Sequence, residues 1–345
     1  MKNVFEFLIV MTASLKFIEN RKTLFFVFFL PIFFGISPCY SQVYTTLTEP
    51  GTALFVNGIS GNEVVGTSDN GNGFVYDINT QQYTTLTGPS GALAVQANGI
   101  SGSGNVVGIY YDSGFNPHAF LYNGSTYSTL SDPLAAAGST TPNGISGSSI
   151  AGYYTDSNNA DHGFLYNGST YTVLDVPSSQ ATHAYGVSGN LVVGDYVDNS
   201  GNKYGFLYNG STYTILNDPL AATGSQAGTH AYSISGSNVA GYYTDGNNID
   251  HGFVYNINTQ QYVTYDDPLG TEGTDLYGIA GGNAVGIYTD SSGNPESFLL
   301  SGIPEPESLQ MIFGGIGLLV LGAVVQRKRR RLSRSRGCSG NVFDG

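Results

Sequence analysis

Oxygen-bearing side chains recur in this 345-residue chain at spacings that suit cation binding. Two clusters each place two aspartates and one asparagine within six residues: Asp156, Asn158 and Asp161, and Asp245, Asn247 and Asp250. Carboxylate and amide oxygens are the ligands that Ca²⁺ prefers, so both clusters are candidate metal sites and Ca²⁺ is a candidate cofactor. The alternative is structural, because Asp and Asn also open turns by accepting hydrogen bonds from their own backbone. The sequence favours this alternative, since no EF-hand spacing is present.

The five histidines offer a second kind of chemistry. His118, His162 and His251 hold the same place in a repeated pattern, which should spread them apart in space. His183 and His230 both occur in the sequence THAY, and we expect them on adjacent repeats near the mouth of a channel. Such a pair could share a metal ion, although a structural or surface role is the default for isolated histidines.

Catalytic motifs are missing from the sequence. It contains no G-x-S-x-G elbow, no H-E-x-x-H pair and no phosphate loop, and its cysteines, Cys39 and Cys338, lie near its ends. A carbohydrate-active enzyme, a hydrolase or a lyase, would need two or three acidic residues that break the repeat pattern and meet at one mouth of the channel. Because context singles out no acidic residue, we predict no catalytic residue and a protein that is not an enzyme.

Charge separates the middle of the chain from its ends. Lys203 is the only Lys or Arg in residues 42–303, which carry 20 acidic residues and a net charge of −19. A surface of this sign repels phosphate backbones and attracts cations, so nucleic acid is not an expected partner. The same span contains no cysteine, and its stability must therefore come from packing rather than from disulfides.

An internal repeat positions these residues. Stretches related to NGISG start at six places along the chain: Asn57, Asn98, Asn143, Tyr185, Tyr232 and Tyr277. Steps of 41 to 47 residues are typical of propeller blades or of helical repeats. Val, Ile, Tyr, Phe and Thr dominate the short runs between these stretches, and Gly, Asn and Asp end them, which indicates strands and turns.

Each complete repeat contains four such runs. Asn-Gly pairs that start at Asn123, Asn167 and Asn209 separate the last two runs and predict type I′ hairpins. We predict an all-β fold, a six-bladed β-propeller over residues 42–303. The last repeat lacks its fourth run, whereas the sequence QVYTTLTEPG, which begins at residue 42, matches the fourth run of another repeat. An N-terminal strand should therefore complete the last blade, close the ring and remove an open edge. A linear β-solenoid is the alternative.

The N-terminal part, residues 1–41, has the pattern of a signal peptide. A basic flank precedes an apolar run over residues 24–36, and small residues then lead to a site for signal peptidase near Ser41. The leader is long, and Met11 is an alternative start. Cys39 offers a lipoprotein as a second alternative.

The C-terminal part combines a Pro-Glu-Pro tripeptide, an uncharged apolar stretch over residues 311–325 and a basic cluster. The residues that define its two ends are Pro304, Glu305 and Pro306, and Arg327, Lys328, Arg329, Arg330 and Arg331. Residues 304–331 resemble the PEP-CTERM sorting signal of bacterial exported proteins. The resemblance implies an exosortase-type sorting enzyme as a partner and an inner-membrane helix before processing, with residues 332–345 as a cytoplasmic tail. An ordinary membrane anchor is the alternative.

The sequence NPHAFLYNG around His118, with looser copies at Asp161 and Asp250, resembles the bacterial extracellular HAF-repeat family. The resemblance implies a secreted or surface repeat protein. We predict that it reaches the cell surface or the extracellular space and serves adhesion, or binds exopolysaccharide or a surface protein of the extracellular matrix. The alternatives are the carbohydrate-active enzyme and a structural surface-layer component. The longer loops, which join the second and third runs and successive repeats, form the expected binding face.

Overall fold

The computed structural model of the protein describes residues 42–49, 52–224 and 227–304. The predicted signal peptide, and the sorting signal from Glu305 onward, lie outside these residues. The described segments contain 24 strands and no helix in their regular secondary structure. Accordingly, no helix within them is long and apolar enough to cross a membrane.

The strands form antiparallel groups of four, numbered here from one to six along the chain. Groups one to three are β2 (Leu54–Ser60), β3 (Glu63–Ser68), β4 (Gly73–Asp77), β5 (Gln82–Leu86); β6 (Ala94–Ile100), β7 (Val106–Tyr111), β8 (Pro117–Tyr122), β9 (Tyr127–Leu130); and β10 (Thr140–Ser146), β11 (Ser149–Thr155), β12 (Asp161–Tyr166), β13 (Tyr171–Leu174). Groups four to six are β14 (Ala181–Ser188), β15 (Leu191–Val197), β16 (Lys203–Tyr208), β17 (Tyr213–Leu216); β18 (Gly228–Ser235), β19 (Asn238–Thr244), β20 (Asp250–Asn256), β21 (Gln261–Thr264); and β22 (Gly273–Ala280), β23 (Asn283–Thr289), β24 (Pro295–Ser301), β1 (Val43–Thr46).

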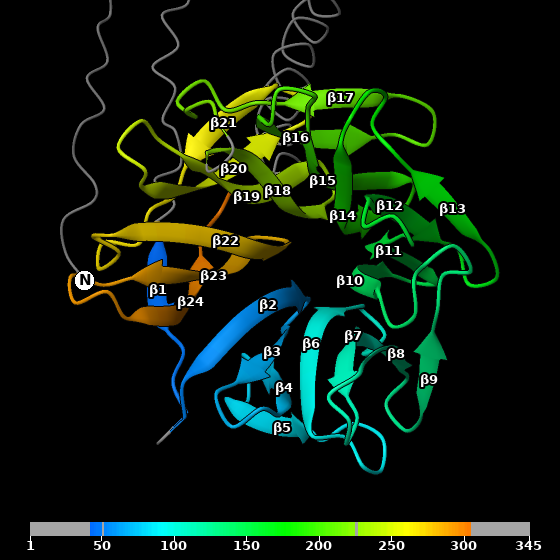
Figure 1. Ribbon diagram of the computed structural model, residues 1–345. Coiled ribbons are helices and arrows are strands. Elements are labelled where there is room, and N and C mark those ends of the chain that lie inside the picture. Colours follow the sequence, from blue (N-terminus) through cyan, green and yellow to red (C-terminus); the bar gives the residue numbers. More distant parts are fainter. Residues whose placement is uncertain (1–41, 50–51, 225–226, 305–345) are drawn as a thin grey trace, which may run out of the picture. The chain divides into compact units, whose positions relative to one another are not determined.

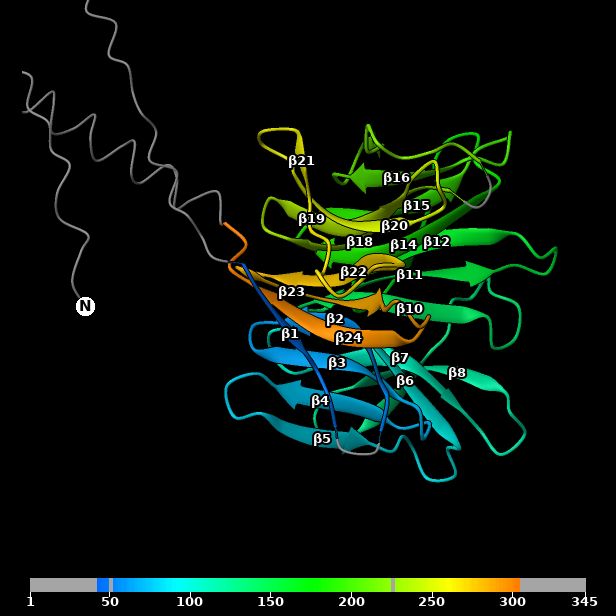
Figure 2. The ribbon, with the colours of Figure 1, turned by 90° about the vertical axis from the view of Figure 1, so that its left-hand side faces the viewer.

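These groups are the blades of a propeller (Figure 1). Four blades are separate sheets, and blades four and five are joined by one parallel pair between Lys203 and Gly228. The first strand of each blade contacts the first strand of the next, and β22 contacts β2, so the ring is complete. Seen from the side, the strands of successive blades lie stacked around the ring (Figure 2). The prediction of an all-β propeller is confirmed.

The N-terminal strand closes the ring as predicted. β1 pairs antiparallel with β24, from Val43 opposite Ser301 to Thr46 opposite Phe298. The next residue, Leu47, donates its backbone N–H to Ser297 at 2.8 Å and is buried between the sixth blade and the first. The two ends of the described chain therefore belong to one sheet, as a closed ring requires and a linear solenoid does not.

The core lies between the blades. Six buried clusters each draw their residues from two neighbouring blades, so both faces of every sheet are apolar. A phenylalanine on the third strand is buried at the same position in every blade: Phe74, Phe120, Phe164, Phe206, Phe253 and Phe298. Each ring lies over a glycine of the second strand. At Gly152, for example, a Cβ atom would come within 2.6 Å of the Phe164 ring and 2.2 Å of a backbone oxygen, so the close approach requires glycine.

The turns between third and fourth strands differ from the prediction. A type I′ hairpin needs positive φ at both central residues, but of the first pair only Gly124 has it, at 91°. The connection is a four-residue turn in which Asn123 Oδ1 accepts the backbone N–H groups of Ser125 and Thr126 at 3.1 and 2.9 Å. The asparagine therefore acts through its side chain, and the type I′ prediction was wrong.

Candidate functional site

Every first strand carries a β-bulge at the same repeat position. The pairing with the second strand skips one residue in each blade. The six skipped residues are those that mark the repeat: Asn57, Asn98, Asn143, Tyr185, Tyr232 and Tyr277. All six line the central channel, because a bulge frees a residue from the ladder and re-aims its side chain. We call this layer the waist of the channel.

Three asparagines form one half of the waist and tie blades together. The Asn57 side-chain amide donates to the Ala97 carbonyl at 2.9 Å, across to the next blade. Asn98 and Asn143 repeat the bond to the carbonyls of Pro142 and Ala184, at 2.9 and 3.0 Å. The bulge thus serves the assembly of the ring as well as the shape of its channel.

Three tyrosines form the other half. The rings of Tyr185 and Tyr232 stack with centroids 4.4 Å apart, and Tyr277 meets Tyr232 edge-on at 5.0 Å. Burial raises the pKa of each hydroxyl well above its ordinary value, so all three are neutral hydrogen-bonding groups. The waist is therefore lined by aromatic rings on blades four to six and by side-chain amides on blades one to three.

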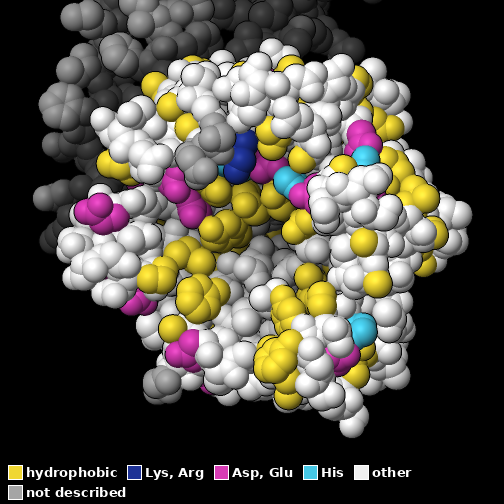
Figure 3. Space-filling view, in the orientation of Figure 1, with side chains coloured by type: hydrophobic (Ala, Val, Ile, Leu, Met, Phe, Trp, Pro, Cys, Tyr) yellow, Lys and Arg dark blue, Asp and Glu magenta, His cyan; other side chains and the backbone are white. Residues whose placement is uncertain are grey.

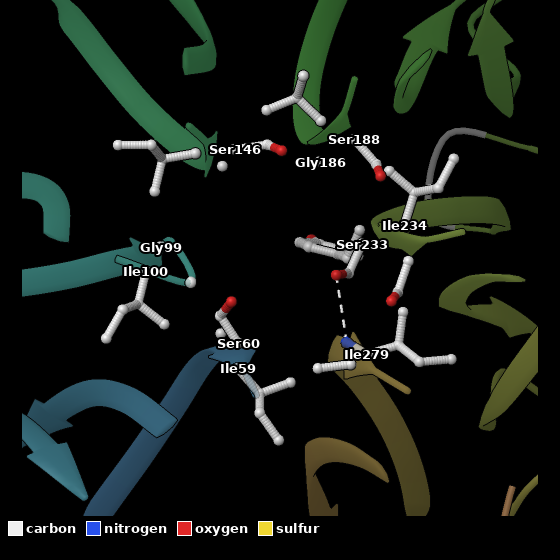
Figure 4. A pocket seen from close by; sticks show the side chains of 18 of the residues that line it. Ile59, Ser60, Gly99, Ile100, Ser146, Gly186, Ser188, Ser233, Ile234 and Ile279 are labelled. Atoms are coloured by element: carbon white, nitrogen blue, oxygen red, sulfur yellow. Dashed lines mark hydrogen bonds between the residues drawn. The ribbon is translucent and has the colours of Figure 1, made fainter. Parts of the chain in front are cut away.

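A cavity of about 750 Å³ lies on one side of the waist. Its wall consists of the ends of the first strands and the short turns to the second strands, so we call this side the turn end. None of the described residues that line the cavity is charged. Serine hydroxyls of Ser60, Ser146 and Ser188 point toward the open centre, and isoleucines such as Ile100 point away (Figure 4). Ser146 and Ser188 hydroxyls make no hydrogen bond within the described part of the chain, so both are free for a ligand.

The other side of the waist, the loop end, carries the long loops (Figure 3). Lys203 is the only Lys or Arg among the described residues, so the dark blue side chain in that view marks the first residue of β16. Hydrophobic side chains line the hollow at the centre, with acidic and histidine side chains around it. The expected binding face is therefore hollowed, but the cavity of about 750 Å³ lies at the opposite end.

A titratable layer lies at the loop end, two residues before the waist on each first strand. Blades four, five and six contribute His183, His230 and Asp275 at this position. His183 and His230 are held by one carboxylate, Asp195 on β15: His183 Nδ1 lies 2.8 Å from one oxygen, and His230 Nδ1 lies 2.6 Å from the other. His183 Nε2 also lies 3.1 Å from Asp161. The two THAY histidines thus lie on adjacent blades as predicted, joined by a carboxylate.

Charge and burial oppose each other within this layer. Burial alone would raise the pKa of Asp195, but the hydrogen bonds from the two histidines outweigh it and hold that pKa well below its ordinary value. Burial alone would lower the pKa of His183, but Asp195 and Asp161 raise it overall. Asp195 is therefore an ionised carboxylate, 4% exposed, that favours the protonated form of His183.

Asp275 is the opposite case. Burial, followed by the nearby charge of Asp250, raises the pKa of Asp275 to about 7. The Tyr277 hydroxyl donates to its Oδ2 at 2.9 Å. Its Oδ1 is shielded from solvent and has no hydrogen-bond partner among the described residues. One channel end therefore holds one acid that is ionised and one that is neutral over part of the physiological range.

The two candidate calcium clusters form turns. Asp156 Oδ1 accepts the backbone N–H groups of Asn158 and Ala160 at 2.8 and 2.9 Å, while Asp161 accepts the Thr155 hydroxyl at 2.7 Å. The second cluster repeats these bonds around Asp245, Asn247 and Asp250. The described residues contain no group of three or more His, Cys, Asp or Glu suited to a metal ion. The structural role that the sequence favoured is thus visible, and calcium binding stays the alternative to be tested by experiment.

The remaining histidines are spread around the loop end, as predicted. His162 and His251 contact Asp175 and Asp266 through Nδ1, each at 2.8 Å, and His118 contacts Asp112 at 3.0 Å. Each pair lies within one blade at the surface, and the pairs do not meet. They stabilise loops rather than form a common site.

Sequence reasoning missed Asp195 and Asp275. The signal was present, because Asp195 interrupts VVGDYV where other repeats have Ile, Tyr or Thr, and Asp275 stands where two repeats have His. The register that places both beside the channel comes from the bulge, which the repeat pattern does not reveal.

No protein-family model and no curated protein matches the sequence. Among solved structures, the chain is similar to a putative TolB from Agrobacterium tumefaciens, at 12% identity over 76% of this chain and 98% of that one, with a TM-score of 0.50. The match to a fucose-recognising six-bladed lectin from Aleuria aurantia covers 74% of this chain and 93% of the lectin, at 13% identity and a TM-score of 0.43. The match to the propeller domain of a Pyrococcus furiosus protease covers 74% of this chain and 98% of that domain, at 9% identity and a TM-score of 0.46. Likeness at these identities concerns the fold alone, and the chain is a β-propeller protein.

Proposed function

We propose that this chain is an exported, surface-sorted propeller that binds carbohydrate of the extracellular matrix without altering it chemically, and that the sugar occupies the turn-end cavity. The observation that carries the proposal is the charge-free wall in a molecule that is otherwise strongly acidic. The volume of about 750 Å³ falls within the range of small-molecule sites.

The wall matches the chemistry of a neutral sugar. Serine hydroxyls and asparagine amides both donate and accept hydrogen bonds, as sugar hydroxyls do. The tyrosine half of the waist offers aromatic surface against which the apolar face of a sugar ring can pack. A charged ligand would find no opposite charge here, so a neutral polyhydroxylated ligand fits best.

The two ends of the sequence support the location. The leader implies export with cleavage by signal peptidase, and the PEP-CTERM resemblance implies sorting by an exosortase-type enzyme. In this proposal the C-terminal helix anchors the protein in the inner membrane before processing, and the propeller then reaches the cell surface, where adhesion and exopolysaccharide binding take place.

The test is binding of the purified full chain, in detergent, to an array of neutral oligosaccharides. Replacing Ser146 and Ser188 together by alanine should weaken the strongest binder about 10-fold, because two ligand hydrogen bonds are lost without loss of any protein bond. Ser292→Ala, in an exposed loop at the loop end, is the matched control. Ser146→Leu should block binding by filling the cavity. Equal binding by all variants would contradict the proposal.

A second candidate function rests on Asp195 and Asp275. These acidic residues break the repeat pattern and lie at the loop end of the channel, which meets part of the condition for a carbohydrate-active enzyme. They stand on blades four and six, and His230 of blade five bonds to Asp195. Their environments move the two pKa values in opposite directions, which is how acid and base roles are separated in such enzymes. New reducing ends in exopolysaccharide incubated with the chain, lost in Asp275→Asn, would establish catalysis; their absence favours binding alone.

A further inference from the structure

The loop end of the channel holds an acceptor that the protein leaves unused. Asp275 Oδ1 has no hydrogen-bond partner among the described residues, although its other oxygen accepts the Tyr277 hydroxyl. A shielded carboxylate oxygen without a donor or cation is costly. The same layer contains no Lys or Arg bonded to Asp275, since Lys203 forms no ion pair with any described residue.

His230 supplies a second unused acceptor on the adjacent blade. Its side chain is 7% exposed, and its Nδ1 lies 2.6 Å from the Asp195 carboxylate. In the neutral imidazole the proton therefore sits on Nδ1, and Nε2 presents a lone pair. No hydrogen bond within the described segments engages Nε2. His230 and Asp275 hold the same position on β18 and β22, which contact each other.

Aromatic rings surround these two acceptors. Tyr242 stacks on the His230 ring with centroids 4.6 Å apart and lies 5.7 Å from Tyr232. Tyr277 meets Tyr242 edge-on at 6.5 Å. Tyrosine faces attract cations, and they do so more strongly where water is excluded. Two acceptors beside three such rings form a setting for a small cation that can donate hydrogen bonds.

We propose that the loop end of the channel is a binding site for a protonated primary amine, which donates to the Asp275 carboxylate and to His230 Nε2 and lies against the tyrosine rings. The amine site lies on the loop-end side of the waist and the neutral cavity on its turn-end side, and Tyr232 and Tyr277 of the waist border both. It goes beyond the proposed function, which places a sugar in the turn-end cavity, and it uses Asp275 for binding where the second candidate function uses it for catalysis.

An ammonium group fits better than a metal ion. Ca²⁺ takes about six to eight oxygen ligands, and the described residues offer no suitable group of three. The groups facing Asp275 are Asp250, His230, Tyr242 and Tyr277, so the local field is negative. Because burial, and after it the charge of Asp250, raises the pKa of Asp275 to about 7, binding of a cation near neutral pH should release a proton.

The amine could belong to an amino sugar or to a lysine side chain, and calorimetry of the full chain can distinguish them. The probes are a glucosamine hexamer, the same hexamer with every amine acetylated, and trilysine. We expect the free-amine hexamer to bind, with a heat that changes between buffers of different ionisation enthalpy. The acetylated hexamer should bind at least about 10-fold more weakly at this site, since its nitrogen carries no charge.

Asp275→Asn should reduce affinity for the free-amine hexamer about 10-fold or more and abolish proton release. Tyr277→Phe tests the positioning bond to Asp275 and should reduce affinity less. The matched control is Asp290→Asn, a half-buried acid at a turn of the same blade, where an asparagine retains the bonds from the backbone N–H groups of Ser292 and Asn294. The Ser146 and Ser188 double variant should bind the amine as the wild type does, so failure of the cavity proposal leaves this one standing.

Equal affinity of both hexamers for the Ser146 and Ser188 double variant, in which the cavity no longer contributes, or full binding and proton release by Asp275→Asn, would overturn the amine site. Binding of trilysine alone would support the site and identify a peptide source. Since Asp275→Asn removes a strained charge, it should fold, and its melting curve verifies this.

Discussion

At the scale of the residue, Asp195 organises the loop end of the channel. Asp161, His183, Asp195 and His230 form one chain of hydrogen bonds that spans the third, fourth and fifth blades. The carboxylate fixes the orientation of both imidazole rings, because each of its oxygens accepts a hydrogen bond from the Nδ1–H of one histidine. An ionised group this deeply buried is stable only because both of its oxygens are engaged.

Asp195→Asn should therefore destabilise the fold by about 3 kcal/mol, because an amide offers one acceptor where two are needed and leaves a donor against a histidine. Urea unfolding followed by tyrosine fluorescence measures the loss. Asp198→Asn, at the exposed turn after the same strand, is the control and should cost little. A variant at position 195 as stable as the control would show that the network adds no stability.

The raised pKa of Asp275 predicts that the stability of the fold falls as pH rises. Its folded pKa of about 7 lies above its ordinary value of 3.8, so the folded protein binds the proton more tightly than the unfolded chain. Binding of this proton contributes its full stabilisation of the fold at pH values below 3.8, the ordinary pKa. The contribution is lost as pH rises through about 7.

Between about pH 5 and about pH 8, the wild type should thus lose more stability than Asp275→Asn, as urea unfolding at both values will show. The raised pKa of His183 acts in the same direction in both proteins and cancels in the comparison. Parallel pH profiles would rule out a titrating Asp275.

At the scale of the element, each blade depends on a fit between a second-strand glycine and a third-strand phenylalanine. The contact lets the rings fill the space between sheets without displacing the first strand. It explains why the second run of every repeat contains a glycine in a strand that otherwise prefers branched side chains.

Gly152→Ala should destabilise the protein by about 1–3 kcal/mol, since its Cβ would meet Phe164 at 2.6 Å and the Thr141 oxygen at 2.2 Å. Thermal unfolding provides the measurement. Gly246→Ala is the matched control, because its Cβ would meet nothing within 4 Å and its φ is not positive. Equal melting temperatures for both variants would refute the packing argument.

The elements were predictable from the sequence to a greater degree than the site. Repeat spacing and the complementary partial repeats at the two ends are enough to predict four-stranded blades and the role of β1. The hairpin turns were mispredicted because Asn123 works through its side chain rather than its backbone. Asp195 and Asp275 were missed because strand alternation alone does not place them: the bulge shifts the register, and the partners come from neighbouring blades.

At the scale of the whole molecule, closure by β1 joins the two ends of the ring. Deleting residues 42–49 should lower the melting temperature sharply, because β24 then exposes its edge and Leu47 no longer fills the gap between blades six and one. A synthetic peptide of residues 42–49 should restore part of the loss by pairing with β24, and a scrambled peptide should not. An unchanged melting temperature after deletion would mean that β1 does not hold the ring closed.

Net charge sets a second property of the whole molecule. With 20 acidic residues and one lysine in residues 42–303, repulsion between blades opposes folding, and salt should raise the melting temperature by screening this repulsion.

Because the Asp and Asn clusters form turns by themselves, Ca²⁺ should raise the melting temperature no more than Mg²⁺ does at equal ionic strength. A larger calcium effect, reversed by chelator, would establish Asp156 and Asp245 as parts of real sites.

The pairing of β1 with β24 also fixes the order of events during synthesis. Synthesis from the N-terminus makes β1 first and β24 last, so β1 stays unpaired while every other blade is made. The ring cannot close until the final strand is complete, and the closing contact is the one with the largest separation along the described part of the chain. A chain that ends before β24 therefore keeps an open edge in its last blade.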